Sequence, residues 1–507
     1  MTQTIGIVNL KMLQKIKKNK WFYAIISAIA AGLYAIVHTY GTNFFLVSSW
    51  PQFGMMLLFF IAFPIVVFVL TKIIVERIAF LKKFEKYSIP ILNAGFFTFF
   101  IIGKTYGFNA RRMLVLGCFF AVCLAIFLWK HYEKIVIFQF LLALIAFVKI
   151  PPMLYEYVTR SEAWLQQPDA IEEATFQKTP NIYVIQPDGY VNFSELGKGM
   201  YNFDNSDFSN HLKAKNFKIY DNFRSNYIST LLSNTALFTM KHHHMIGHEN
   251  KGALFGLPSK IVGNNSVLST LKNNQYKTFL LLEYPYLLMS RPTLAYDECN
   301  INYYDIPWFG NNAFKDQYDL IEPLKEAINT NKNSRNFYFI EKIAPSHITR
   351  TKSDAPDVES DREKYLDKLK ETNDWLKEIT DIIIQNDPNS LIVITADHGG
   401  FVGLDYYAEI LEKQTDRDKI YAVFSAALAI KWPEGNAPDY DSKFASTVNL
   451  FRILFTYLSE DESYLKHLED DKSFSLIIED APYGLYEYID AEGNIVFKKH
   501  EETTKKE

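Results

Sequence analysis

The sequence contains little cysteine and little net charge. Its 507 residues include three cysteines, and 53 Lys and Arg nearly balance 57 Asp and Glu, which leaves a formal charge of -4. Cys118 and Cys123 lie in an apolar run and Cys299 stands alone in the polar half. This distribution excludes a disulfide within the polar half and a zinc-ribbon site. The balanced charge argues against a nucleic-acid-binding protein, which usually has a strongly basic face.

Long apolar runs are concentrated before residue 150. Five apolar segments each approach the length of about 20 residues that crosses a bilayer; they are 21–40, 53–76, 88–108, 113–129 and 134–150. The basic stretch KMLQKIKKNK precedes the first segment. No small-residue cleavage site follows it and four further segments do, so we expect a retained anchor rather than a signal peptide.

Lysine and arginine predict the orientation of these segments. The N-terminal lead, the loop after the second segment and the turn after the fourth hold most of them, namely Lys11, Lys15, Lys17, Lys18, Lys20, Lys72, Arg77, Lys82, Lys83, Lys86, Lys130 and Lys134. The alternate loops hold only Lys104, Arg111 and Arg112. This bias predicts a cytoplasmic N-terminus, and five crossings would then place everything after residue 150 outside.

The apolar segments carry few ionisable groups. A transporter more often has acidic residues or broken helices at mid-depth, so an anchor is favoured over a transporter. Residues 151–179 begin with a Pro pair and then mix aromatic and charged residues. Tyr155, Tyr157 and Trp164 suit the lipid–water boundary, and we expect a juxtamembrane helix and linker here.

The remaining half has the pattern of an α/β domain. Short apolar runs typical of buried strands occur at 181–186, 277–283, 336–343 and 390–396. Between the last two, residues 361–385 carry apolar side chains at helical spacing and stop at Asn386-Asp387-Pro388. Strand, helix, strand in this order predicts a mainly parallel sheet covered by helices on both faces.

Acidic and imidazole side chains follow three of these strands. Asp188 follows the first, His347 the third, and Asp397 and His398 the fourth, in the stretch VITADHGG. Each alone has an ordinary explanation: Asp188-Gly189 suits a turn and His347 a polar loop. Because ligand sites in such sheets lie beyond the carboxyl ends of strands, the three together indicate a shared site, and Asp next to His suggests a metal ion.

The stretch SNYISTLLSNTALFTM at 225–240 is rich in hydroxyl residues and becomes helical in pattern from Thr230. A Thr at a helix start is ordinarily a cap. The same position also favours a phosphate, because free amides and the helix dipole attract an anion.

Asp188, STLLSNTALFT, FYFIEKIAPSH and ADHGG together resemble the alkaline-phosphatase/sulfatase superfamily. Within it they are similar to the membrane-anchored phosphoglycerol and phosphoethanolamine transferases, such as the lipoteichoic acid synthases. The resemblance implies a helical membrane domain of about five spans at 1–150, a linker at 151–179, and an extracytoplasmic alkaline-phosphatase-like α/β domain at 180–500. It also implies a multi-pass protein of the bacterial inner membrane with a periplasmic catalytic domain.

The resemblance assigns roles to individual residues. Thr230 occupies the nucleophile position and, with Asp188, Asp397 and His398, the metal-ligand positions. His347 matches a histidine that contacts the transferred phosphate or the leaving group. Residues 444–458 resemble a helix near the end of these domains.

A second set of residues follows the second strand. Arg291, with Tyr284 and Trp308, lies in loops that could line a substrate pocket, although packing or surface roles suit these residues equally.

Departures from the family pattern narrow the chemistry. No histidine occurs between His398 and His467, which favours one metal ion over two, and three oxygens with one nitrogen suit Mn or Zn better than Mg. No cysteine lies in the nucleophile region, so sulfate-ester hydrolysis through formylglycine is not expected. The stretch KHHHMIGH at 241–248 could bind a metal, but adjacent histidines cannot all converge on one ion, and a polar loop is favoured.

The hypothesis is a transferase that moves a phosphoglycerol or phosphoethanolamine headgroup from a membrane phospholipid to a glycan or lipid acceptor through phospho-Thr230. One alternative is a metal-dependent phosphodiesterase or phosphatase that uses water. A second is a catalytically inactive membrane protein that acts in binding or assembly.

Overall fold

The computed structural model describes residues 20–47, 49–159, 161–244, 256–309, 313–355 and 357–500. The chain forms two compact units. The helical unit comprises residues 1–160 with 289–291 and 306–312, and the α/β unit comprises the rest. The division at residue 160 falls within the segment 151–179 predicted as a linker. The sequence gives no indication that two short later segments group with the helices.

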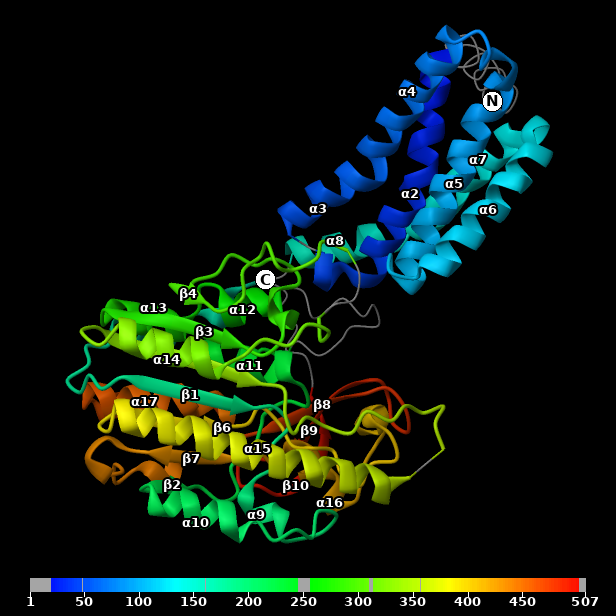
Figure 1. Ribbon diagram of the computed structural model, residues 1–507. Helices are drawn as coiled ribbons and strands as arrows, with labels where there is room; N and C mark the ends of the chain where they lie inside the picture. Colours follow the sequence, from blue (N-terminus) through cyan, green and yellow to red (C-terminus); the bar gives the residue numbers. More distant parts are fainter. Residues whose placement is uncertain are drawn as a thin grey trace. The chain divides into compact units, whose positions relative to one another are not determined.

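Helices cover all five predicted apolar segments (Figure 1). They are α2 (Lys20–Val47), α3 (Trp50–Leu57), the π-helical turn η1 (Leu58–Ala62), α4 (Phe63–Arg77), α5 (Glu85–Tyr106), α6 (Arg111–Phe127) and α7 (Tyr132–Phe147), followed by α8 (Ile150–Thr159). Short 3-10 turns, η2 (Lys82–Phe84) and η3 (Trp129–His131), join α4 to α5 and α6 to α7. Four stretches are long and apolar enough to cross a membrane, namely Trp21–Thr42, Trp50–Arg77, Lys82–Tyr106 and Trp129–Tyr155. The fourth predicted span, 113–129, lies mostly in α6, which has 17 residues.

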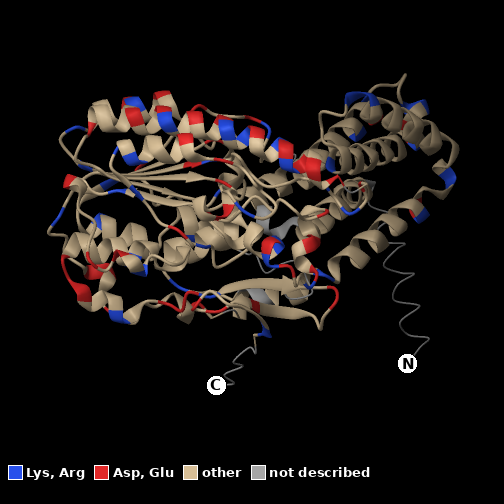
Figure 2. Cartoon of the chain, turned by 90° about the horizontal axis from the view of Figure 1, so that it is seen from below, with Lys and Arg blue, Asp and Glu red and all other residues tan. Residues whose placement is uncertain are grey.

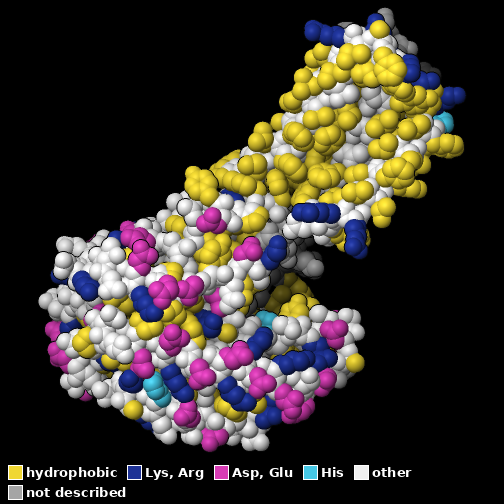
Figure 3. Space-filling model, viewed as in Figure 1, with side chains coloured by type: hydrophobic (Ala, Val, Ile, Leu, Met, Phe, Trp, Pro, Cys, Tyr) yellow, Lys and Arg dark blue, Asp and Glu magenta, His cyan; other side chains and the backbone are white. Residues whose placement is uncertain are grey.

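Hydrophobic side chains cover the visible face of the helical unit (Figure 3), while its interior holds a polar link between three helices. On α5, Asn93 Nδ2 donates to the Ser27 carbonyl of α2 and to Gln139 Oε1 of α7, both at 2.8 Å. Gln139 Nε2 donates back to Asn93 Oδ1 at 2.9 Å. Buried amide pairs of this kind fix how apolar helices pack, because an unpaired amide is costly there.

The α/β unit is built on a seven-stranded sheet of order β2-β7-β6-β1-β5-β3-β4. The four predicted strands are confirmed as β1 (Ile182–Pro187), β3 (Tyr276–Leu282), β5 (Arg335–Lys342) and β6 (Leu391–Thr395). They pair in parallel with one another or, for β3, also with β4 (Glu298–Cys299). Two unpredicted strands, β7 (Leu428–Lys431) and β2 (Phe217–Ile219), extend the sheet in antiparallel pairings. The sheet is therefore mainly parallel, as expected.

Helices lie on both faces of this sheet (Figures 1 and 2). One contacting set is α10 (Ser206–Ala214), α14 (Ile321–Thr330) and α15 (Val358–Asn386); the other is α11 (Thr230–Thr239), α12 (Leu257–Val262), α13 (Ser266–Asn273) and α17 (Leu450–Ser459). Every residue of β1 and of β6 is buried, as two covered faces require. The charged residues in Figure 2 lie mainly outside the central strands.

Smaller elements complete the α/β unit. α9 (Phe193–Leu196) follows β1, and α16 (Arg417–Phe424) precedes β7. A separate antiparallel sheet of order β10-β9-β8 is formed by β8 (Ser473–Ile477), β9 (Gly484–Ile489) and β10 (Ile495–Lys499).

Candidate metal and phosphoryl-transfer site

The loops that follow β1, β5 and β6 are joined by backbone hydrogen bonds. The Asp188 amide donates to the Lys342 carbonyl at 2.9 Å, and the Ser346 amide donates to the Asp188 carbonyl at 2.8 Å. The Ile348 amide in turn donates to the Gly400 carbonyl at 3.2 Å. The three strand ends singled out in the sequence therefore meet at one edge of the sheet.

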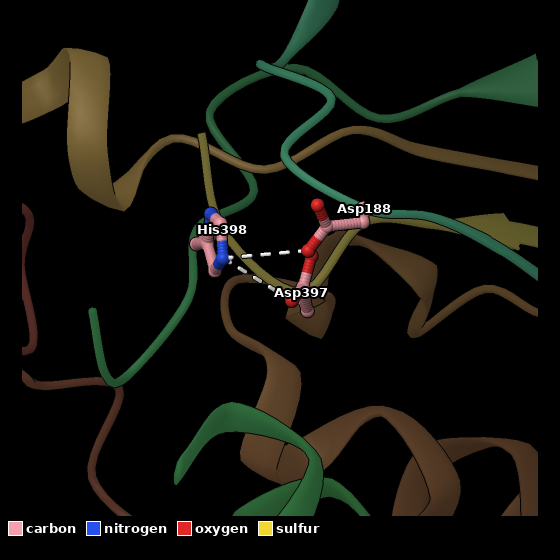
Figure 4. A group of neighbouring side chains, drawn as sticks. All are labelled: Asp188, Asp397 and His398. Atoms are coloured by element: carbon pink, nitrogen blue, oxygen red, sulfur yellow. Dashed lines mark ion pairs between the residues drawn. The ribbon is translucent and has the colours of Figure 1, made fainter. Parts of the chain in front are cut away.

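Asp188, Asp397 and His398 form a buried cluster at this edge (Figure 4). One ligand atom from each lies within 4.8 Å of the others. His398 Nε2 is 3.6 Å from Asp188 Oδ1 and 3.3 Å from Asp397 Oδ2. The Gly189 amide donates to the other Asp397 oxygen, Oδ1, at 3.1 Å. The side chains converge on one point, which is the geometry of a coordination site.

The His398 ring is oriented by its own loop. Its Nδ1 donates to the Gly399 carbonyl at 2.8 Å, so Nε2 of the neutral ring presents a lone pair to the two carboxylates. Burial raises the pKa of Asp397 to about 6. Burial opposes the charged form of His398, yet the combined attraction of Asp397 and Asp188 raises its pKa. The cluster as it stands thus has an excess of negative charge.

The residues present fit a divalent cation. Asp397 Oδ2 is buried and has no hydrogen-bond partner. Among the described residues, the His398 ring is the one basic group within ion-pair distance of the two carboxylates, and it carries a charge only when it is protonated. A buried unpaired acceptor beside a second carboxylate is costly without a positive charge. Carboxylate oxygens with one imidazole nitrogen are ligands that Zn and Mn accept.

Thr230 points its hydroxyl into this cluster. It is the first residue of α11, and Ser229 is the N-cap, so Thr230 is not the cap that its position in the sequence could suggest. Thr230 Oγ1 donates to Asp188 Oδ1 at 3.0 Å and lies 3.4 Å from His398 Nε2. A hydroxyl is therefore in contact with two metal-ligand candidates at the positive end of a helix.

The two glycines after His398 allow the loop to pack tightly. A Cβ on Gly399 would lie 2.2 Å from the Ala422 carbonyl oxygen, and one on Gly400 would lie 2.1 Å from the Tyr365 ring. Any side chain at either position would displace the β6 loop that carries Asp397 and His398.

His347 lies beside the cluster. Its ring centroid is 5.8 Å from that of His398, and the ring stacks on Phe401 at 5.0 Å. Its Nδ1 donates to the Ile348 carbonyl at 2.6 Å. Burial, followed by the charge of His398, lowers the pKa of His347. A neutral ring with Nε2 as an acceptor is thus favoured at rest.

Arg291 has a different setting. Its guanidinium lies 3.6 Å from the Trp308 ring centroid and donates to the Ile306 carbonyl at 2.6 Å. All three residues group with the helical unit. Substrate binding by Arg291 stays a prediction.

Two further residues support the site and were not predicted from the sequence, Tyr365 and Glu341. On α15, the Tyr365 hydroxyl donates to the Gly189 carbonyl at 2.9 Å and accepts from the Val191 amide at 3.2 Å. Glu341, fully buried in β5, accepts from the Tyr286 hydroxyl at 2.6 Å. Burial, with repulsion from Asp397 and Asp188, raises the pKa of Glu341 well above its usual value. A Glu inside the apolar stretch NFYFIEKI was the available signal.

The histidine-rich stretch is described only as far as residue 244. His243 is buried and stacks on Tyr227 at 4.1 Å, and His244 stacks on His500 at 4.3 Å. This part is a loop, as expected, but its rings are packed against aromatic neighbours. The remaining residues, 245–248, lie outside the described part of the chain.

Comparison with known families identified one match. The sequence profile described as Sulfatase matches residues 191–459, which include Thr230, His347, Asp397 and His398. The sequence matched none of the curated proteins with which it was compared.

Similar solved structures include two phosphoethanolamine transferases and the periplasmic domain of EcEptC. The C-terminal periplasmic domain of EcEptC from Escherichia coli is 14% identical, covers 62% of this chain and 95% of its own, and has a TM-score of 0.40. The integral membrane protein lipooligosaccharide phosphoethanolamine transferase A (EptA) from Neisseria meningitidis is 14% identical. The match covers 84% of this chain and 95% of EptA, with a TM-score of 0.40. The C-terminal periplasmic domain of EptC from Campylobacter jejuni is 16% identical, covers 56% and 93%, and has a TM-score of 0.35. The family assignment rests on the sequence profile.

Proposed function

Because this chain belongs to the sulfatase family, we propose that it is a metal-dependent phosphotransferase. In this proposal a phosphoglycerol or phosphoethanolamine headgroup moves from a membrane phospholipid to a glycan or lipid acceptor. The observation that carries it is the contact of Thr230 Oγ1 with Asp188 and His398 at the N-terminus of α11. A threonine hydroxyl is a nucleophile for phosphorus. No cysteine, from which formylglycine could form, lies in the nucleophile region at 225–240.

Asp188, Asp397 and His398, with the Thr230 oxygen, are the residues that would hold one Mn or Zn ion. When bound, such an ion supplies positive charge that lowers the proton affinity of a hydroxyl and offsets charge on phosphoryl oxygens. Asp188 Oδ1 already accepts the Thr230 hydrogen bond and is therefore placed to take its proton.

Thr230 then forms a bond to phosphorus, and the bond from phosphorus to the diacylglycerol oxygen breaks. The leaving oxygen takes up a proton, which the protonated form of His347, beside His398, would donate. The product is phosphothreonine. An acceptor hydroxyl next attacks the same phosphorus and gives its proton to His347. The bond from phosphorus to Thr230 breaks, and Thr230 recovers its proton from Asp188.

We also propose on which side of the membrane the α/β unit lies. With the 17-residue α6 counted as a crossing beside the four longer stretches, the chain crosses five times. Five crossings and the lysine bias favour a cytoplasmic N-terminus and an extracytoplasmic α/β unit in a bacterial inner membrane. Anchoring the domain in the bilayer keeps it at the surface where a lipid donor is concentrated.

The decisive experiment is mass spectrometry of the peptide that contains Thr230, after the full-length protein is incubated with membrane lipids and Mn or Zn. We expect a headgroup phosphate on Thr230, and its mass names the group. The Thr230→Ala variant should lose turnover while keeping near-normal metal content. Turnover by that variant would contradict the covalent route. Comparing products with and without a glycan or lipid acceptor separates transfer from hydrolysis by water.

A further inference from the structure

A second site lies in the helical unit, at the end where α2 begins. A cavity of about 690 Å³ is bounded there by parts of six elements. Its lining residues are Tyr23 of α2, Lys72 of α4, Lys82 and Lys83 of η2, Glu85, Lys86, Ile89 and Pro90 of α5, Trp129 and Lys130 of η3, and Tyr132 and Glu133 of α7. Lysines exceed glutamates in this lining by five to two. We propose that this cavity binds the phosphate headgroup of an anionic phospholipid.

Charge is the first observation behind this proposal. Lys72 is buried and paired with Glu76 at 3.0 Å and with Glu85 at 3.8 Å, so its charge is offset within the protein. The other four lining lysines are exposed, and in the described part of the chain none of them forms an ion pair with a carboxylate. Four exposed ammonium groups around one cavity outnumber the two glutamates of its lining, and a bound anion would reduce the repulsion among them.

Aromatic rings lie close to three of these four lysines, Lys83, Lys86 and Lys130. Lys83 Nζ lies 4.2 Å from the Phe80 ring centroid. Lys86 Nζ lies 4.9 Å from both the Tyr87 and the Trp129 ring centroids. Trp and Tyr rings prefer the headgroup level of a bilayer, and lysines near helix ends extend their ammonium groups to the same level. The cavity is thus at the depth of lipid phosphates.

The surroundings favour a lipid over a soluble phosphate. Phe80, Phe84 and Ile78, next to the lysines in the α4–α5 connection, are 67%, 44% and 47% exposed. In addition, α4 and α5 belong to stretches long and apolar enough to span a membrane. A headgroup bound by the lysines would leave its acyl chains against apolar helix surface, whereas a free phosphate would gain nothing from these side chains.

The site is independent of the proposed transfer reaction. It uses no residue of the cluster around Thr230, and the lysine bias assigns this end of the bundle to the cytoplasmic leaflet. A lipid bound here would join α4, α5 and α7 through their end residues and stabilise the helical unit.

The test uses purified full-length protein in neutral detergent, with lipid binding followed by native mass spectrometry. Phosphatidylglycerol and phosphatidylcholine with identical acyl chains are titrated separately into wild type, Lys82→Gln/Lys86→Gln and Arg111→Gln/Arg112→Gln. The control pair is exposed, removes the same charge and lies at the start of α6, outside the cavity lining. With about a five-fold loss for each of the two lysines, we expect the cavity variant to bind phosphatidylglycerol roughly 25-fold more weakly. The control should change less than two-fold.

Two further arms complete the test. Lys82→Arg/Lys86→Arg should retain binding, which separates loss of charge from loss of fold. Inorganic phosphate added at millimolar concentration should not displace the lipid. Equal binding of both lipids to wild type, equal losses in the two Gln variants, or displacement of lipid by inorganic phosphate would each overturn the proposal.

Discussion

Gln186 and Asn234 exchange two hydrogen bonds in the buried interior of the α/β unit. Gln186 Nε2 donates to Asn234 Oδ1 at 2.7 Å, and Asn234 Nδ2 donates to Gln186 Oε1 at 2.8 Å. Gln186 lies in β1, two residues before Asp188, which directly follows this strand. Asn234 follows Thr230 by about one turn of α11. This amide pair therefore connects the strand that carries a candidate metal ligand to the helix that carries the candidate nucleophile.

Replacing Asn234 by Ala should misplace Thr230. The change leaves the Gln186 amide buried without its partner, which costs about 1–3 kcal/mol of unfolding free energy. We expect kcat to fall by about ten-fold or more, with a smaller change in KM, because the helix start moves relative to Asp188. The matched control is Thr235→Val, which removes only a hydrogen bond within α11, from Thr235 Oγ1 to the Leu231 carbonyl. Equal effects of the two variants on kcat would contradict the positioning role.

Removing Asp397 should remove the metal. We expect Asp397→Ala to lose bound Mn or Zn by elemental analysis, while Asp207→Ala, at an exposed surface pair with Lys377, keeps it. For wild type, chelation should lower the melting temperature, because an ion that binds only the folded state stabilises it by about 2.7 kcal/mol at a hundred times its Kd. Unchanged metal content in Asp397→Ala would exclude this residue from the ligand set.

Tyr365→Phe should weaken metal binding without leaving a cavity in the core. The ring keeps its packing against Gly400, but the hydroxyl bonds to the Gly189 carbonyl and the Val191 amide are lost, at about 1–2 kcal/mol. Tyr183→Phe is the control, since it loses a comparable bond to Asp387 at the opposite end of β1. Metal affinity, measured by calorimetry, should fall in Tyr365→Phe and hold in Tyr183→Phe.

The raised pKa of Glu341 predicts that the free energy of unfolding depends on pH. Its folded-state pKa is raised, so the folded protein keeps a proton that the unfolded chain releases above about pH 4.5. Stability from this carboxyl is full below that pH and declines as pH rises, by at most about 1.4 kcal/mol per pH unit. Glu341→Gln retains an acceptor for Tyr286 and does not ionise. We expect urea unfolding at saturating metal to show that the free energy of unfolding of the variant, relative to that of wild type, increases from pH 5 to pH 8. A difference between the two proteins that does not change with pH would count against a protonated Glu341.

The orientation in the membrane can be tested at Tyr304, whose side chain is 96% exposed. In a variant without the native cysteines, Tyr304→Cys should react with a membrane-impermeant maleimide once the outer membrane is permeabilised. Reaction only after the inner membrane is broken would reverse the proposed orientation.

The sheet and the core of the site were predictable because their signals are local. Each of β1, β3, β5 and β6 is an apolar run of strand length, and α15 has apolar side chains at helical spacing over many turns. The polar residues after three of those strands had to meet once the strands were parallel, which is why Asp188, Asp397 and His398 were found together.

Other features depend on partners distant in the chain. β2 and β7 have three and four residues, too few for a periodic pattern, and only their pairing with each other and with β6 defines them. The partner of Asn234 is also fixed by tertiary packing, because nothing near it in the sequence distinguishes Gln186 from other polar residues. The same holds for residues 306–309, which contact Gln52 and Phe59 of the helical unit through Trp308 and Phe309.

The borders of the main sheet have a consequence for a protein held at a surface. The outermost strands, β4 and β2, have two and three residues. Lys277, on the neighbouring strand β3, forms an ion pair with Glu298 of β4. Copies confined to a bilayer meet one another far more often than copies in solution, and a long bare border would let them join strand to strand into polymers. Such short, charged borders offer an incoming chain few free amides and carbonyls, so we expect crowding in two dimensions to cause little strand-to-strand aggregation.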